Sequence, residues 1–111
     1  MKPINNPYYT EEEAVARVGP GWEHLVRRVY NAIAGLGLNT GIINVKEKFG
    51  GLRIYPDYWQ DDLEKVIIEV ETESFTVCEK CGKDGGLRNM GGTYQTACEE
   101  HAKGYPEISP F

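Results

Sequence analysis

Residues 78–101 read CEKCGKDGGLRNMGGTYQTACEEH, and this stretch holds all three cysteines of the 111-residue chain and one of its two histidines. The four residues are spaced as Cys78-x2-Cys81-x16-Cys98-x2-His101. Two short-spaced pairs separated by a small loop are typical of a tetrahedral zinc site with thiolate and imidazole ligands. Gly82 allows the first pair to close in a tight turn, and the second pair has the spacing of one helical face. We therefore predict one zinc ion, bound by Cys78, Cys81, Cys98 and His101.

The predicted zinc site is structural, because four protein ligands close the coordination sphere, whereas a catalytic zinc keeps one position for water. Three cysteines do not suit a framework made of disulfides alone. A redox role for Cys78 and Cys81 lacks the βαβ context of thioredoxin-like proteins. Between the two pairs, glycines surround short apolar pieces at Leu87 and Tyr94, and this pattern predicts a hairpin that links the pairs.

Two helices are predicted in the N-terminal third of the chain. Thr10 and Glu13 form a capping-box pattern, so a short helix is expected to run to about Val18 and to stop at the Gly-Pro-Gly sequence of 19–21. The second helix has apolar residues at helical spacing and ends at the glycines 35 and 37. Its apolar face consists of Trp22, Leu25, Val26, Val29, Tyr30 and Ile33.

Residues 41–55 predict a β-hairpin. Ile43 and Val45 alternate with polar residues on one side, and Leu52 and Ile54 do so on the other. The Gly-Gly pair after Phe49 supplies the positive φ angles that a tight hairpin turn needs.

Residues 57–75 fit two structures. The alternation and the β-branched residues of 66–72 favour a strand, whereas the length and a capping pattern at 57–60 favour a helix. We predict the helix. Its apolar face consists of Trp59, Leu63, Val66, Ile67, Val70 and Ser74.

Together these elements predict an α+β fold, in which helices pack on one side of a small antiparallel sheet and a zinc ribbon or knuckle completes the C-terminal part. A chain of 111 residues fits a single domain, 1–111. Within it, we assign 1–76 to the α+β core, 77–103 to the zinc-binding lobe and 104–111 to an extended tail, where two prolines oppose a helix.

Charge and hydropathy bear on partners and location. The formal net charge of −5 disfavours a broad non-specific nucleic-acid surface, although it is compatible with a local basic patch. No apolar run approaches the ~18 residues of a membrane span, and the N-terminal Met-Lys-Pro-Ile-Asn-Asn-Pro lacks the apolar stretch of a signal peptide. Clustered thiols that suit a metal fit a reducing compartment. The sequence therefore predicts a cytoplasmic protein without a membrane partner.

Several cations are candidates for contact with a partner. If the predicted hairpin packs beside the second helix, its cations and those on the polar helix face form a basic patch for phosphates. The alternative is a solvated charged face that includes Glu23 and Glu47. The candidate cations are Arg27, Arg28, Lys46, Lys48 and Arg53.

Phe49, at the predicted turn, is either an exposed anchor for a partner or a side chain that folds back over the core. The sequence contains no nucleophile–base pair at a motif spacing, no phosphate-binding loop and no open metal position. We therefore expect that the protein is not an enzyme.

Four stretches carry a resemblance to a known group of proteins. They are Gly21-Trp22 before an amphipathic helix, KEKFGGLR at 46–53, Cys78-x2-Cys81-Gly82 and Cys98-x2-His101. Across about residues 20–101 the chain resembles a family of small zinc-binding proteins from bacteriophages and prophages. The resemblance implies a viral or prophage origin and a zinc knuckle, favours the helix over 57–75, and implies no mechanism. The chain differs from the family at Thr93-Tyr94, where members often carry Trp.

Two hypotheses of function follow. The first is a non-enzymatic, phage-derived protein that docks on a host protein in the host cytoplasm, for instance as an inhibitor of a bacterial defence system such as CRISPR effectors. The alternative is a zinc-ribbon accessory protein that binds nucleic acid through the predicted patch of Lys46, Lys48 and Arg53.

Overall fold

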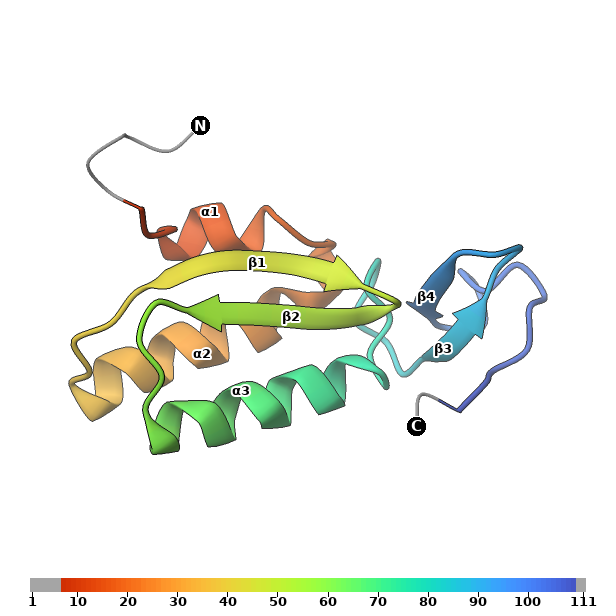
Figure 1. Ribbon diagram of the computed structural model, residues 1–111. Coiled ribbons are helices and arrows are strands. Elements are labelled where there is room, and N and C mark those ends of the chain that lie inside the picture. Colours follow the sequence, from red (N-terminus) through yellow and green to blue (C-terminus); the bar gives the residue numbers. More distant parts are fainter. Residues whose placement is uncertain (1–6, 110–111) are drawn as a thin grey trace.

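The computed structural model describes residues 7–109, and within them the chain forms three α-helices and two two-stranded antiparallel sheets (Figure 1). The predicted α+β class is therefore confirmed. No helix of residues 7–109 is long and apolar enough to cross a membrane. In chain order the elements are α1 (Glu11–Val15), the 3-10 turn η1 (Pro20–Trp22), α2 (Glu23–Leu36), β1 (Ile42–Lys48), β2 (Gly51–Pro56), α3 (Asp61–Ser74), β3 (Gly86–Asn89) and β4 (Tyr94–Ala97).

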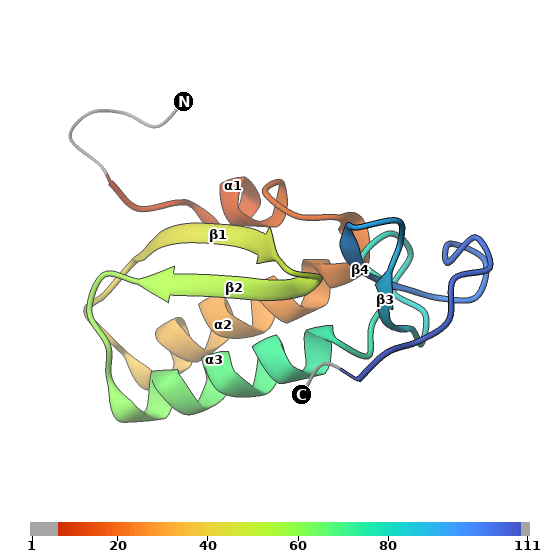
Figure 2. The same cartoon turned by 45° about the vertical axis from the view of Figure 1, so that its right-hand side comes forward.

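The core lies between the β1–β2 hairpin and the helices. In Figures 1 and 2 the hairpin runs over α2, with α1 along β1 and α3 along β2. Apolar residues from α2, both strands and α3 bury their side chains in one cluster, and such burial is the main favourable term in folding. The fully buried members with the largest side chains include Trp22, Leu25, Ile42, Leu52, Ile54, Leu63 and Ile67.

Both edges of the two-stranded hairpin are capped by neighbouring segments. On the β2 edge, the Leu52 N–H donates to Ser74 Oγ at 2.9 Å and the Ile54 N–H donates to Glu71 Oε2 at 3.0 Å. On the β1 edge, the Tyr9 N–H donates to the Ile42 carbonyl at 2.8 Å. Because exposed strand edges invite pairing with other chains, these bonds protect the β2 edge at Leu52 and Ile54 and the first residue of the β1 edge.

The helices follow the predictions except at their ends. The Thr10–Glu13 capping box is present, but α1 ends at Val15, three residues before the predicted end. After it the Arg17 N–H bonds to the Ala14 carbonyl in a tighter turn, and the chain continues to η1. The second helix ends, as predicted, at Gly37, which caps it in a left-handed conformation with φ 64°. The third helix is confirmed, but its N-cap is Gln60, and Trp59 lies before it, 47% exposed.

The hairpin differs from its predicted pattern at one strand position. A register shift between Ile42 and Asn44 interrupts the alternation of β1. Ile42 and Val45 are buried, whereas Ile43 is 42% exposed. The prediction that Ile43 shares a face with Val45 is therefore wrong, because Ile43 is the unpaired residue of a bulge between Ile42 and Asn44, and the bulge puts Ile42 on the face of Val45.

The turn of the hairpin uses Phe49 and Gly50 rather than the two glycines. Lys48 pairs with Gly51 in the ladder, and the two intervening residues have φ angles of 53° and 87°, as in a type I′ turn. Gly51 serves packing instead, because a Cβ there would collide with the Phe75 ring. Phe49 consequently adopts the left-handed backbone that costs a residue with a Cβ ~1–2 kcal/mol.

Residues 77–109 form a C-terminal lobe around the β3–β4 hairpin. The predicted hairpin between the ligand pairs is confirmed. The tail runs back along β3, where the Ile108 N–H donates to the Leu87 carbonyl at 2.7 Å. Arg88, which is 4% exposed, donates to the Tyr105 carbonyl at 2.6 Å and the Ala97 carbonyl at 3.2 Å. The tail was predicted to be extended over 104–111, and its last two residues lie outside the described part of the chain.

Phe49→Asn tests the cost of the turn. Asn adopts the left-handed backbone at lower cost, and Asn-Gly is the preferred pair in a type I′ turn. We expect Phe49→Asn to exceed Phe49→Ala by about 1 kcal/mol in the free energy of unfolding, measured by chemical denaturation. Both variants lose the contact of the Phe49 ring with Tyr94, so that contact cancels in the comparison. Equal stabilities would show that the left-handed backbone carries no cost here.

Candidate metal centre

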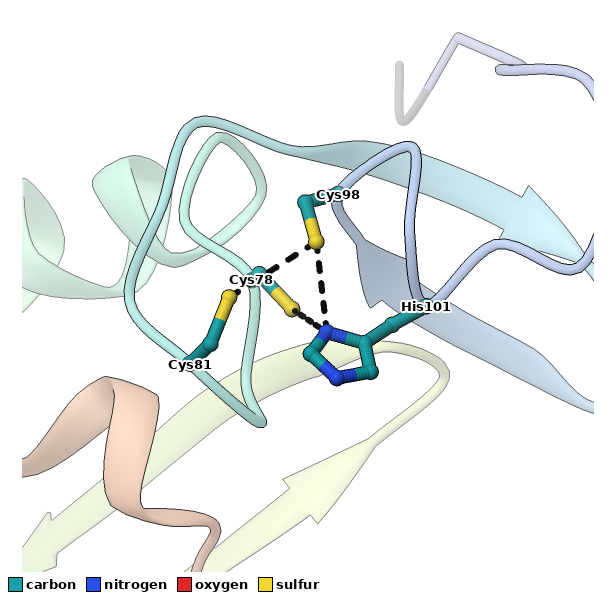
Figure 3. A group of neighbouring side chains, drawn as sticks. All are labelled: Cys78, Cys81, Cys98 and His101. Atoms are coloured by element: carbon teal, nitrogen blue, oxygen red, sulfur yellow. Dashed lines mark hydrogen bonds between the residues drawn. The ribbon is translucent and has the colours of Figure 1, made fainter.

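Three sulfur atoms and one imidazole nitrogen converge at the base of the C-terminal lobe (Figure 3). Cys98 Sγ lies 3.6 Å from Cys81 Sγ and 3.2 Å from His101 Nδ1, and Cys78 Sγ lies 3.5 Å from the same nitrogen. All four ligand atoms lie within 4.8 Å of one another. A regular tetrahedron with edges of 3.6 Å has its centre ~2.2 Å from each corner, which is close to the length of metal–thiolate and metal–imidazole bonds. The four predicted ligands can therefore hold a metal ion.

Each ligand pair is positioned by its own turn. After α3, the Gly82 N–H donates to the Cys78 carbonyl at 2.9 Å, and Gly82 has a φ of 81°. This closes the first turn so that both of its sulfurs face the same point. After β4, the Ala102 N–H donates to the Cys98 carbonyl at 2.8 Å. This single helical turn brings His101 over Cys98, as the spacing of three predicted.

Backbone dipoles favour the thiolate form of Cys78. Burial opposes its ionisation, but N–H groups directed at the sulfur outweigh burial and lower the pKa of the Cys78 thiol to about 6. Those groups belong to Cys98, Cys81 and Lys80. At Cys81 the Lys83 N–H acts in the same direction, yet desolvation and the two neighbouring sulfurs raise its pKa. A thiol that ionises readily, Cys78, beside a thiol that resists ionisation, Cys81, makes a site that a cation would stabilise.

The first ligand turn is joined to the core through Gly21. Its N–H donates to the Glu79 carbonyl at 2.7 Å, and a Cβ on Gly21 would collide with the Cys78 carbonyl oxygen. Next to it, the indole N–H of Trp22 donates to the Val77 carbonyl at 2.8 Å. The Gly-Pro-Gly-Trp sequence thus packs against the ligand turn and holds it on the core. Interpretation of this stretch only as a helix stop misses this role.

Glu79 fixes the same junction from the other side. Its carboxylate accepts from the Gly19 N–H at 3.1 Å. Burial raises the pKa of this carboxyl group, and the Gly19 N–H opposes that effect. The residue directly after a predicted metal ligand therefore serves to bind the ligand turn to the core.

Arg27 and Arg28 do not extend a basic patch. Arg27 forms ion pairs with Glu11, Glu12 and Glu23 at 2.7–2.9 Å. These carboxylates hold the pKa of Arg27 well above its usual range. Arg28 pairs with two further carboxylates, Glu69 at 3.8 Å and Glu73 at 2.8 Å. Five carboxylates thus surround two guanidinium groups, so this face of α2 carries no net positive charge and resembles the charged face that was the alternative to a basic patch.

The three cations of the hairpin are differently placed. Lys46 and Arg53 are cross-strand partners, and within residues 7–109 neither Lys46 nor Lys48 has a carboxylate within 4 Å. Their ammonium groups instead lie over aromatic rings, Lys46 at 5.6 Å from the Tyr55 centroid and Lys48 at 5.8 Å from the Phe49 centroid. Arg53 has one distant carboxylate, Glu71 at 3.7 Å.

Phe49 is exposed rather than folded over the core. Its side chain is 67% accessible, and its ring meets the Tyr94 ring edge to face, with centroids 6.5 Å apart. Of the two predicted alternatives, the exposed position is the one that the structure shows. The contact with Tyr94 joins the hairpin turn to the C-terminal lobe.

No family model, curated protein or solved structure matches this chain.

Gly21→Ala tests the junction between the ligand turn and the core. The added methyl group would collide with backbone atoms, which cannot move without opening the turn. We expect the free energy of unfolding to fall by about 2 kcal/mol or more, together with a loss of metal affinity measured by competition with a chelator. The control is Gly35→Ala, where a Cβ meets open space within α2. There we expect a gain of roughly 0.5–1 kcal/mol and unchanged metal affinity. Equal effects at both glycines would contradict the assigned role of Gly21.

Proposed function

We propose that the metal is zinc and that its role is structural. A tetrahedral set of three thiolates and one imidazole is a donor set that zinc prefers, whereas hard cations prefer oxygen ligands. Four protein ligands leave no position for a substrate or a reactive water. The ion would join the turn after α3 to the turn after β4, and so close the C-terminal lobe on itself.

The zinc proposal predicts one zinc ion per chain in the purified protein, measured by elemental analysis. Reconstitution with Co²⁺ is expected to give the intense visible absorption of a tetrahedral thiolate site. His101→Ala should weaken cobalt binding strongly, whereas His24→Ala is the matched control, because His24 lies outside the ligand group. A purified protein that holds iron, or a disulfide in place of metal, would contradict the assignment.

We further propose that the protein is a non-enzymatic binding protein of bacteriophage origin that docks on a host protein. The observation that carries the docking role is Phe49, a large apolar side chain that is 67% exposed and held in a left-handed backbone. Strain and exposure both cost stability, and residues that combine them gather where a protein binds or acts. The phage origin rests on the resemblance of 20–101, and inhibition of a host defence system is the form of docking that we propose.

Hydrogen bonds of the neighbouring Gly50 hold Phe49 in place and support its role as an anchor. The carbonyl of Gly50 accepts from the buried Thr96 hydroxyl at 2.7 Å, and the Gly50 N–H donates to Glu47 Oε2 at 2.6 Å. These two bonds therefore fix the turn to β1 and to β4. A surface held in its binding conformation loses little entropy on association.

The second candidate function is nucleic-acid binding through Lys46, Lys48 and Arg53. One observation favours it: these cations lie together with the rings of Tyr55 and Phe49 on one hairpin, and single-stranded nucleic acid is bound by grooves that combine cations and aromatic rings. The net charge of −5 opposes it, because the remaining surface repels phosphates.

Capture from a bacterial lysate, with and without nuclease, separates the two functions. We expect a host protein that the tagged chain retains after nuclease treatment, identified by mass spectrometry. Phe49→Asn should reduce its affinity by about tenfold or more, as for an interface anchor. Trp59→Asn is the matched control, since Trp59 is also an exposed aromatic residue but lies before α3.

Either of two results would overturn the host-docking proposal. One is that no host protein stays bound after nuclease treatment at micromolar concentration. The other is that the captured material is nucleic acid, released steeply as salt rises, which would favour the second candidate.

A further inference from the structure

A groove lies where the hairpin turn meets the C-terminal lobe. It encloses about 420 Å³ and is walled by residues from the hairpin, the end of α3, β3, β4 and the tail. In both ribbon views the turn between β1 and β2 points at β4 (Figures 1 and 2). The apolar lining consists of Phe49, Phe75, Leu87, Tyr94 and Ile108.

Two cations stand beside these apolar walls. Lys48 and Arg53 also line the groove. Within residues 7–109 Lys48 has no carboxylate within 4 Å, and the guanidinium group of Arg53 lies 3.7 Å from its one carboxylate partner, Glu71. In a chain of net charge −5, the groove is lined by two cations and by no carboxylate side chain, although Glu47 lies next to it and accepts from the Gly50 N–H. An occupant that complements it has an apolar part and a negative part.

We propose that this groove takes an extended acidic–apolar segment of the partner protein. An apolar side chain would enter between Phe49 and Leu87, and flanking carboxylates would face Lys48 and Arg53. The inference rests on the proposed docking on a protein and names the kind of segment that is recognised.

The ring geometry favours a peptide over single-stranded nucleic acid. Base stacking needs an open aromatic face. Phe49 and Tyr94 instead meet edge to face at 82°, and the Lys48 ammonium group already lies over the Phe49 ring. The aliphatic walls of Leu87 and Ile108 match branched or aromatic side chains of a peptide.

The first probes are three synthetic peptides that share a central Leu-Phe pair, flanked on both sides by Glu, by Gln or by Lys. Binding to the full, metal-loaded chain is measured by fluorescence anisotropy, and the site is mapped by amide chemical shifts. We expect the Glu peptide to bind about tenfold more tightly than the Gln peptide and the Lys peptide to bind least. Shifts should concentrate at Phe49, Leu87 and Tyr94.

Paired variants assign the two parts of the recognition. Lys48→Gln combined with Arg53→Gln should remove the preference for the Glu peptide over the Gln peptide while leaving the Gln peptide's affinity unchanged. Phe49→Asn should lower the affinity for both the Glu and the Gln peptide. A loss of turn stability would not explain this result, because Asn-Gly is expected to form the turn more readily than Phe-Gly. Trp59→Asn should change neither affinity. Denaturation curves of each variant check that the fold is retained.

Three results would overturn the inference. They are equal affinity for all three peptides, tighter binding of a dT12 oligonucleotide than of the Glu peptide, and shifts at the groove that instead follow self-association of the chain. The lysate capture keeps this failure separate from that of the proposed function. A host protein retained equally by the natural chain and by Phe49→Asn would leave docking on a protein in place and exclude the groove as its site.

Discussion

The close approach of Gly21 to the first ligand turn is the contact on which the arrangement of the two halves depends. Here two backbones meet without a side chain between them, and the Gly21 N–H donates to the Glu79 carbonyl at 2.7 Å. The indole N–H of Trp22 extends the contact from the middle of the core to Val77. Burial of Trp22 and formation of the ligand turn therefore support each other, and the C-terminal lobe packs directly on the core.

The same coupling reaches the far end of the hairpin. Closing the lobe fixes β4 next to the turn, where the Thr96 hydroxyl donates to the Gly50 carbonyl. That bond and the Phe49–Tyr94 contact hold a turn whose backbone is unfavourable by itself. An ion held by the four ligands would therefore stabilise the hairpin tip without touching it, because the second ligand pair directly follows β4.

The sequence predicts those features of the structure that depend on local periodicity and on the spacing of the metal ligands. The α+β class, the hairpins, the ligand group and the third helix follow from such patterns. The errors arise where tertiary contact decides. A bulge puts Ile42 rather than Ile43 inside, and packing against Phe75 requires glycine at 51, which moves the turn to Phe49. The buried role of Arg88 depends on tail carbonyls remote in sequence, and no local pattern marks it.

The distribution of charge gives the hairpin tip its distinct character. On the helices the arginines are held by surplus carboxylates, five for Arg27 and Arg28 together. At the hairpin, Lys46 and Lys48 lie over aromatic rings instead. A ring has no net charge and leaves the field of a cation largely intact, whereas a paired carboxylate cancels much of it. In an acidic chain, the cations without a close carboxylate thus lie where the strained aromatic residue is exposed, and the docking proposal rests on this coincidence of charge and apolar surface at a rigid turn.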